Sequence, residues 1–253
     1  MRKFSSEFGH NYDSYSFGYA NYCLREKNDS LAEIYGQGHL PYSGSPDIKN
    51  IFYMARSARV PLESFLLSSE NRRIAKKFDD SFKTTVTPID KFDHTRHSFI
   101  SFCINYFKQR HGPNVMPAER FKTILNSNLI SHIVSYSNGA GPMAYVFEVS
   151  DSNMSHFWFS FYDLSLVHQS LGMWLMLDSA RRAKDRKLKH FYIGTVYGQK
   201  ALYKTAFKNL EYWDGHQWLA DIKKIKHLGR KDNDRTTGLT DLWKKEQKLF
   251  GGL

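Results

Sequence analysis

The sequence predicts a mixed α/β (α+β) fold, and three observations lead to this prediction. Three strand-like runs in the middle of the chain are separated by the turn sequences "NGAG" and "SDSN". Helical periodicities precede these runs, and another helical pattern follows them. A fourth strand pattern comes directly after that helix. An antiparallel meander that passes into a strand, helix, strand crossover is an α/β order of elements.

The first ninety residues are expected to form a smaller, irregular N-terminal unit rich in Tyr and Gly. Within it, residues 36–50 are dense in turn residues, and residues 51–67 predict two short strands with a break near Ala58 to Pro61. A helix is predicted from Ser69, whose hydroxyl can cap it. Residues 87–93 give a hinge before the second unit.

The second unit, residues 91–222, has a more regular pattern. It predicts, in order, a helix at 94–112, a helix at 117–127, strands at 129–137, 142–150 and 154–163, a helix at 170–188, a strand at 190–196, a helix at 200–207 and a hairpin at 211–222. The turn of that hairpin is expected at Asp214-Gly215. Residues 223–253 form a basic C-terminal tail with weaker patterning.

Composition limits the class of protein. The 253 residues are 41% hydrophobic, which is ordinary for a globular protein of one large or two small domains. No run approaches the roughly 20 apolar residues of a membrane span, and the N-terminus lacks a signal-peptide pattern. We therefore expect a cytoplasmic protein with no membrane partner. Cys23 and Cys103 stand far apart, outside any metal-binding spacing, and are expected to be buried free thiols.

Charge is the strongest compositional signal. The formal net charge is +11 and the sequence pI is about 9.5. A basic field attracts a polyanion before any contact is made, so RNA is a leading candidate partner. An acidic surface or a phosphorylated cofactor would use the same field.

The sequence "QSLGMW" opens the helix predicted after the meander. Gln169 and Gly172 keep the Q-x-x-G spacing of the phosphate loop of GNAT acyltransferases, and the order of elements also resembles that fold. Such a loop turns backbone N–H groups at a helix N-terminus toward a pyrophosphate. Trp174 stands where a glycine or alanine is usual. Its bulk is expected to crowd the ligand, which disfavours acetyl-CoA.

The chain resembles a second group more closely, the arginyl-tRNA-protein transferases and their bacterial leucyl-transferring relatives. The matching motifs are Tyr162-Asp163 at a strand end, Ser170-Leu171-Gly172 at a helix start, Tyr192 with Gly194, Lys200 with Tyr203-Lys204 and Phe207, Gly215 with Trp218, and, upstream, Phe65, Ser69, Arg72 and Arg73. This resemblance implies a GNAT-like acyltransferase fold. The family's paired cysteines are absent, with Ala55 to Arg59 in their approximate place, so a redox or iron-sulfur role of that motif is expected to be lost.

The resemblance implies an aminoacyl-tRNA-dependent aminoacyltransferase. Such an enzyme moves an amino acid, here arginine or leucine, from tRNA to the amine of a protein or peptide N-terminus by aminolysis. The implied partners are charged tRNA and an acceptor with a free N-terminus, in particular an acidic one. The co-substrate is the aminoacyl-tRNA, with no cofactor and no metal expected. Alternatives are an acyl-CoA-dependent N-acyltransferase and a non-catalytic RNA-binding relative.

Three residues are candidates for the chemistry. Asp163 would bind an ammonium group or accept a proton. Alternatively, it would only cap the turn before the helix. Tyr203 lies on a short amphipathic helix and is either catalytic or core. Lys204 is costly to bury and is expected to meet a phosphate or a carboxylate. The candidate substrate-binding residues are Tyr162, Ser170, Leu171, Gly172 and Tyr197. Ser170 and Gly172 are also candidates for a plain helix cap.

Basic residues on two helices are candidates for contact with tRNA or with an acidic acceptor. They are Arg72, Arg73, Lys76, Lys77, Arg181 and Arg182. Arginine can pair with a phosphate or a carboxylate through two parallel hydrogen bonds. The alternative is a solvated helix face without a partner. The histidines are scattered singly, so no ligand role is expected for them.

Overall fold

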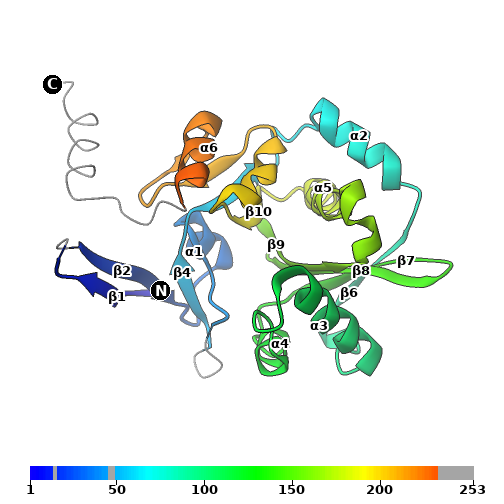
Figure 1. Ribbon diagram of the computed structural model, residues 1–253, viewed down its shortest axis with the longest axis horizontal. Coiled ribbons are helices and arrows are strands. Elements are labelled where there is room, and N and C mark those ends of the chain that lie inside the picture. Colours follow the sequence, from blue (N-terminus) through cyan, green and yellow to red (C-terminus); the bar gives the residue numbers. More distant parts are fainter. Residues whose placement is uncertain (14–15, 45–48, 233–253) are drawn as a thin grey trace.

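The chain is described by a computed structural model that covers residues 1–13, 16–44 and 49–232 (Figure 1). The larger of its two sheets has eight strands, in the order β12 (Trp218–Leu219), β11 (Glu211–Trp213), β5 (Ser57–Pro61), β10 (His190–Thr195), β9 (Met154–Tyr162), β8 (Gly141–Ser150), β7 (His132–Asn138) and β6 (Lys83–Pro88). The smaller has four, in the order β1 (Arg2–Asn11), β2 (Ser16–Leu24), β4 (Ile51–Met54) and β3 (His39–Pro41). The described α-helices are α1 (Leu31–Gly36), α2 (Ser69–Phe78), α3 (His97–His111), α4 (Ala118–Leu125), α5 (Leu171–Asp185) and α6 (Ile222–Lys231).

The larger sheet is antiparallel except between β9 and β10, which run parallel. The chain leaves β9, forms α5 and returns as β10. The predicted passage from a meander into a strand, helix, strand crossover is therefore confirmed, and with it the α+β fold class. His190 to Tyr192 pair with Met154 to His156, and the pairing of these two described strands ends there. Beyond His156 the strands diverge, which opens a space within the sheet.

Helices cover both faces of the larger sheet. Tyr145 of β8 contacts Phe99 of α3, with ring centroids 4.9 Å apart. Tyr136 of β7 lies opposite Ala144 and contacts Trp174 of α5, with centroids 5.4 Å apart. Successive strand side chains point to opposite faces, and Ala144 directly precedes Tyr145. Hence α3 and α5 lie on opposite faces, as Figure 1 shows for α3 with α4 below the sheet and α5 with α2 above it.

The expectation of an irregular N-terminal unit is wrong for the first 24 residues, because β1 and β2 pair over most of their length as a hairpin. The break between β4 and β5 lies at Ala55-Arg56, earlier than predicted. β5 pairs with β10 and β11, and β6 pairs with β7, so the larger sheet takes strands from both sides of residue 90. The division into units at residue 90 stays a prediction.

The helix starts differ in detail from the sequence expectation. Ser68, rather than Ser69, caps α2, and its hydroxyl accepts from the backbone N–H of Asn71. Residues 199–206 form a 3-10 helix, η3 (Gln199–Ala206), instead of an α-helix. Two further 3-10 helices are η1 (Ile89–Lys91) and η2 (Leu164–Gln169). Cys23 and Cys103 are buried and free, as predicted.

The C-terminal tail is described only at its beginning. It starts with α6, and residues 233–253 of the predicted tail lie outside the described residues. Within the described ranges, no helix combines the length and apolar character that a bilayer crossing requires.

Candidate active site

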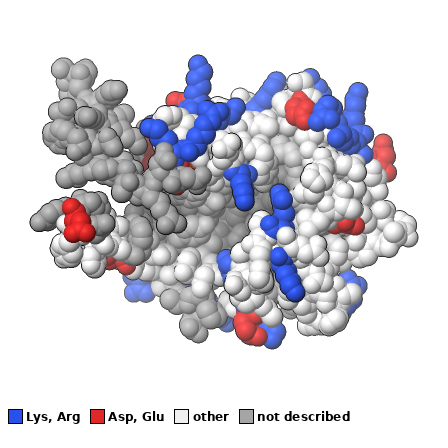
Figure 2. All heavy atoms as spheres, viewed as in Figure 1, with Lys and Arg blue, Asp and Glu red and all other residues white. Residues whose placement is uncertain are grey.

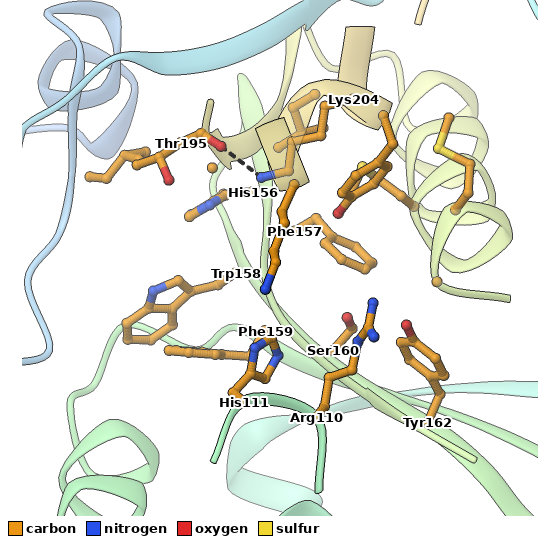
Figure 3. Close-up of a pocket in the computed structure, with 18 of the residues that line it drawn as sticks. Arg110, His111, His156, Phe157, Trp158, Phe159, Ser160, Tyr162, Thr195 and Lys204 are labelled. Atoms are coloured by element: carbon orange, nitrogen blue, oxygen red, sulfur yellow. Dashed lines mark hydrogen bonds between the residues drawn. The ribbon is translucent and has the colours of Figure 1, made fainter. Parts of the chain in front are cut away.

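A cavity of about 1080 Å³ opens where β9 and β10 diverge. Its wall is built by the end of α3, the second half of β9, the start of α5 and η3. Figure 3 shows Lys204 and Thr195 in the upper part of this space, and Arg110, His111, Ser160 and Tyr162 in the lower part. Residues more than ninety positions apart in the sequence therefore face one another.

The lining combines cations with apolar and aromatic side chains. The cations are Arg110, Arg120, Lys200 and Lys204, and the apolar members include Ile74, Tyr106, Phe107, Phe157, Val167, Met173, Met176 and Ile193. Within the described chain, Glu70 is the one acidic side chain of the lining, and Arg73 pairs with it at 2.6 Å. Burial and then the neighbouring Arg110 and Lys200 lower the pKa of His111. The cavity therefore favours anionic groups over additional cations.

Lys204 is the predicted catalytic residue whose environment is most unusual. Its Nζ donates to the carbonyl oxygen of Thr195 at 2.8 Å. Burial lowers the pKa of this ammonium to about 8, from 10.5. The sequence led us to expect a phosphate or carboxylate as the partner of Lys204. Among the described residues, Nζ contacts this carbonyl instead. A lysine held in this way presents a positive charge to the cavity at neutral pH.

His156 is a cavity residue that the sequence did not indicate. Its Nδ1 and the Tyr35 hydroxyl form a hydrogen bond of 2.9 Å, and the residue is 2% exposed. Burial and then the charge of Lys204 lower the pKa of His156 to about 3, so the ring is neutral at physiological pH. The side chains of His156 and Lys204 both lie beside Gly194. A Cβ at this glycine would be 3.8 Å from Nε2 of His156 and 3.6 Å from Nζ of Lys204. No group of three metal-ligating side chains occurs in the described ranges.

Ser170 and Gly172, two of the predicted substrate-binding residues, line the cavity at the start of α5. Ser170 occupies the N-cap position with φ 70° and ψ 30°, but its side chain makes no capping hydrogen bond. The role of a plain helix cap is therefore not supported for its hydroxyl. A Cβ on Gly172 would lie 2.9 Å from the hydroxyl oxygen of Tyr162. This glycine lets α5 approach Tyr162, which is buried and also lines the cavity.

Gly172→Ala is expected to lower kcat/KM about tenfold, which corresponds to about 1.4 kcal/mol. The added methyl would push Tyr162 out of position, although alanine alone would favour the helix by about 1 kcal/mol. Turnover and thermal unfolding would be measured together. Gly139→Ala, where a Cβ meets no atom within 4 Å, is the control. Adding Tyr162→Phe should recover part of the loss, and full activity of Gly172→Ala would contradict this account.

Three predicted site residues do not line the cavity. Asp163 turns its carboxylate to the backbone N–H of Ser165, at 2.8 Å, which is the capping alternative left open by the sequence. Leu171 is fully buried in the core. The Tyr197 hydroxyl accepts from the backbone N–H of Arg56, and its ring lies under the Arg56 guanidinium. Tyr203 lines the cavity and is 50% exposed, so it is not a core residue.

The expectation that Trp174 crowds the ligand is wrong. Its indole packs against Phe78, Phe82 and Tyr136, and its Nε1 donates to Asp79 at 2.9 Å. Trp174 lies three residues after the start of α5 and is buried between α5 and α2, away from the cavity lining. Its bulk therefore does not argue against acetyl-CoA.

The predicted basic residues differ in whether their charged groups are free to contact a ligand. Arg72, Arg73, Lys76 and Lys77 are exposed on α2, where Arg73 is paired with Glu70. Arg181 binds Asp79 through two hydrogen bonds. Arg182 lies in a largely buried network with Glu148, Asp178, Tyr136 and Ser179. For Arg182, the prediction of a free tRNA-binding side chain is therefore wrong, because its donors are already used within the fold.

Arg56 lies in the short connection between β4 and β5. Its guanidinium makes two hydrogen bonds of 2.9 Å to Asp232, which follows α6. Asp232 also accepts from the backbone N–H of Gly198 at 2.6 Å, and Arg56 donates to the carbonyl of Val196. This cluster ties the β4–β5 connection and the end of α6 to the residues that precede η3. The Arg56–Asp232 ion pair therefore connects these three segments beside the cavity.

The larger sheet thus carries its cavity at the point where two parallel strands separate. Solved structures with a related arrangement include the C-terminal domain of a putative lysylphosphatidylglycerol synthetase from Agrobacterium fabrum, with a TM-score of 0.44 at 11% identity over 61% of this chain and 51% of that chain. Another is N-myristoyltransferase from Saccharomyces cerevisiae with bound myristoyl-CoA, with a TM-score of 0.34 at 12% identity over 60% and 44%.

Sequence comparison shows which known proteins the chain is similar to. The family model "Arginine-tRNA-protein transferase, C terminus" matches residues 99–214. Curated relatives named aspartate/glutamate leucyltransferase include one from Hyphomonas neptunium, 28% identical over 64% of this chain and 67% of its own length, and one from Sinorhizobium medicae, 42% identical over 24% of each. A third, from Cereibacter sphaeroides, is 27% identical over 65% of this chain and 61% of its own length. The chain is therefore similar to arginyl- and leucyl-tRNA-protein transferases, which agrees with the resemblance found in the sequence. Its matches span about two thirds or less of the length of these relatives.

Proposed function

We propose that this chain transfers leucine from leucyl-tRNA to the N-terminal amine of a protein or peptide whose first residue is acidic. The observation that carries the proposal is the composition of the cavity, which joins four cations to an apolar wall and contains a single, already paired carboxylate. The curated relatives bear the name aspartate/glutamate leucyltransferase, which agrees with this choice of donor and acceptor.

The apolar wall favours leucine over arginine as the donor residue. Val167, Met173 and Met176 line the cavity near the start of α5. A leucine side chain gains free energy by burial against such residues, about 25 cal/mol for each Å². An arginine side chain would need a carboxylate, and Glu70 is held by Arg73 within the described chain.

The cations favour an acidic acceptor. A carboxylate that enters a cavity lined by Arg110, Lys200 and Lys204 gains charge-assisted hydrogen bonds. The attacking amine must be neutral, and its pKa is ordinarily near 8. Electrostatic attraction can bring the acceptor in through its acidic side chain while the amine itself loses its proton.

Positioning and charge stabilisation account for the chemistry. The amine nitrogen attacks the ester carbon, the bond from that carbon to the tRNA oxygen breaks, and an amide forms. The tRNA 3′ end leaves as a hydroxyl and takes up a proton that the amine loses. We propose that the Lys204 ammonium donates to the oxyanion that develops at the ester carbonyl. Neutral His156 would lie beside it as a hydrogen-bonding group.

The experiment is incubation with a set of radiolabelled aminoacyl-tRNAs and peptides that differ only at the first residue. We expect label from leucyl-tRNA on peptides that start with Asp or Glu, at least tenfold more than on peptides that start with Gln or Ala. Arginyl-tRNA is the matched donor control. Equal transfer from both donors, or equal acceptance of Asp and Ala, would contradict the proposal.

Acetyl-CoA belongs in the same experiment, because Trp174 does not close the start of α5. Acetylation of the peptide without charged tRNA would favour the acyl-CoA alternative. RNA binding without transfer of any group would favour the non-catalytic alternative.

A further inference from the structure

The helix α6 carries six basic side chains on one face. They are Lys223, Lys224, Lys226, His227, Arg230 and Lys231, named here the α6 basic face. At 100° per residue these positions fall within about half of the helix circumference, over roughly 12 Å of its length. The helix lies beyond residues 99–214, to which the family model is matched.

The face of α6 opposite the α6 basic face packs against the core and against η3. Ile225 is fully buried, and Leu228 packs against the main core. At Gly229 an added Cβ would lie 2.6 Å from a methyl carbon of Leu202 in η3. This close packing leaves the helix no freedom to rotate, so the α6 basic face is held toward solvent.

The α6 basic face forms no ion pair with an acidic side chain among the described residues, although Lys224 lies close enough to Asp214 to interact with its carboxylate electrostatically. Asp221 caps the helix, and Asp232 is held by Arg56 and Gly198. The cations of the other basic helices are partly neutralised, since Arg73, Arg181 and Arg182 are each paired with a carboxylate. Figure 2 shows Lys and Arg side chains gathered over α6, on the side of the molecule where the surface is hollowed.

The α6 basic face lies next to the reaction space. η3 contacts α6 on one side, and it lines the cavity through Lys200, Tyr203 and Lys204 on the other. A polyanion that binds along α6 would therefore lie next to η3, the 3-10 helix that contains Lys204.

We infer that the α6 basic face binds the phosphate backbone of the tRNA whose aminoacylated end enters the cavity, and this rests on the function proposed above. A row of cations along one helix matches the regular charges of a nucleic-acid strand. An acidic N-terminal residue offers a single carboxylate, which the cations of the cavity already serve. The pattern therefore favours RNA over the acceptor protein as the occupant.

The test compares two variants with the same change in charge. Lys223→Gln/Arg230→Gln removes two exposed cations from the α6 basic face. Lys83→Gln/Lys91→Gln removes two exposed cations beside β6, at the opposite edge of the larger sheet. The affinity for fluorescein-labelled leucine tRNA without its amino acid is measured by anisotropy from 50 to 200 mM salt. Thermal unfolding checks that both variants remain folded.

We expect the α6 variant to bind tRNA on the order of tenfold more weakly, and its log–log salt slope to fall by about 2, because each lost phosphate contact contributes about 0.9. The β6 control should keep the slope of the unmodified chain. In leucyl transfer, the α6 variant should show a raised KM for leucyl-tRNA with kcat within about twofold.

An unchanged slope in the α6 variant would overturn the inference. Loss of affinity for an Asp-starting peptide with tRNA affinity intact would also overturn it, and would assign the face to the acceptor. If the unmodified chain transfers no leucine and the α6 variant still loses tRNA affinity, the proposed function fails while the RNA surface stands.

Discussion

Lys204→Met is expected to abolish aminoacyl transfer while it raises thermal stability. The pKa of the ammonium falls from 10.5 to about 8 in the folded chain, so the fold carries a penalty for the buried charge at pH 7. A fall of that size corresponds to about 3 kcal/mol. Loss of the hydrogen bond to Thr195 lowers stability by about 1 kcal/mol and so offsets part of this gain. The net gain is about 2 kcal/mol, or roughly 4–8 °C in Tm.

The pH dependence has a definite sign. Below pH 8 both the folded and the unfolded chain hold the proton, and the penalty is complete. Between pH 8 and 10.5 the unfolded chain holds a proton that the folded chain has released. Stability of the unmodified chain therefore rises through this window, and its difference from Lys204→Met narrows. Unfolding at pH 7 and at pH 10 measures this effect.

The activity measurement separates a catalytic role from a structural one. Removal of a donor to a developing oxyanion costs about 10²–10³ in kcat. Lys208→Met, the same change at an exposed position just after η3, should alter neither transfer nor Tm. Retained transfer in Lys204→Met would remove Lys204 from the mechanism, and a fall in Tm at pH 7 would show that the buried charge is stabilising.

Arg182→Met is expected to lower the free energy of unfolding by about 3–5 kcal/mol. The Arg182 guanidinium donates to Glu148 at 2.8 Å and to Asp178 at 2.9 Å. Glu148 is 2% exposed, so the substitution would leave a buried carboxylate without its counter-charge. Urea unfolding measures the loss. Arg186→Met, at an exposed position one turn further along the chain, is the control and should change stability by less than about 0.5 kcal/mol.

A double substitution tests the cause of that loss. Glu148→Gln/Arg182→Met should be less destabilised than the sum of the two single changes, because the unpaired charge is gone. Strict additivity would show that Arg182 contributes by packing alone. At temperatures where the variant is folded, its tRNA affinity should match that of the unmodified chain, since Arg182 has no free donor to offer a phosphate.

Four of the predicted site residues that line the cavity stand close together in pairs along the chain. Ser170 and Gly172 line the cavity through the start of one helix, and Tyr203 and Lys204 through another short helix. Helix starts and short amphipathic runs are local features that a sequence pattern predicts well. His156 and Arg110 have no such pattern around them, and only the packing of β9 and α3 brings them to the same space.

Errors arose where a side chain could point in more than one direction or pair with a distant partner. Trp174 follows the helix start closely in sequence, yet its position on the turn directs it to Phe78 and Phe82. Arg181 is 102 residues from Asp79, and Arg182 is 34 residues from Glu148. A basic run in the sequence therefore does not reveal which of its charges are already neutralised.

The sequence by itself determined the order of strands and helices from residue 94 onward, the crossover from β9 to β10 and the resemblance to known transferases, because these follow from periodicity, turn residues and motifs within short stretches. The tertiary structure decided which side chains face the cavity, that Nζ of Lys204 donates to the Thr195 carbonyl, and that the cations of α6 form no ion pair among the described residues. These properties depend on burial and on charges brought together from distant segments. Local patterns carry no information about either.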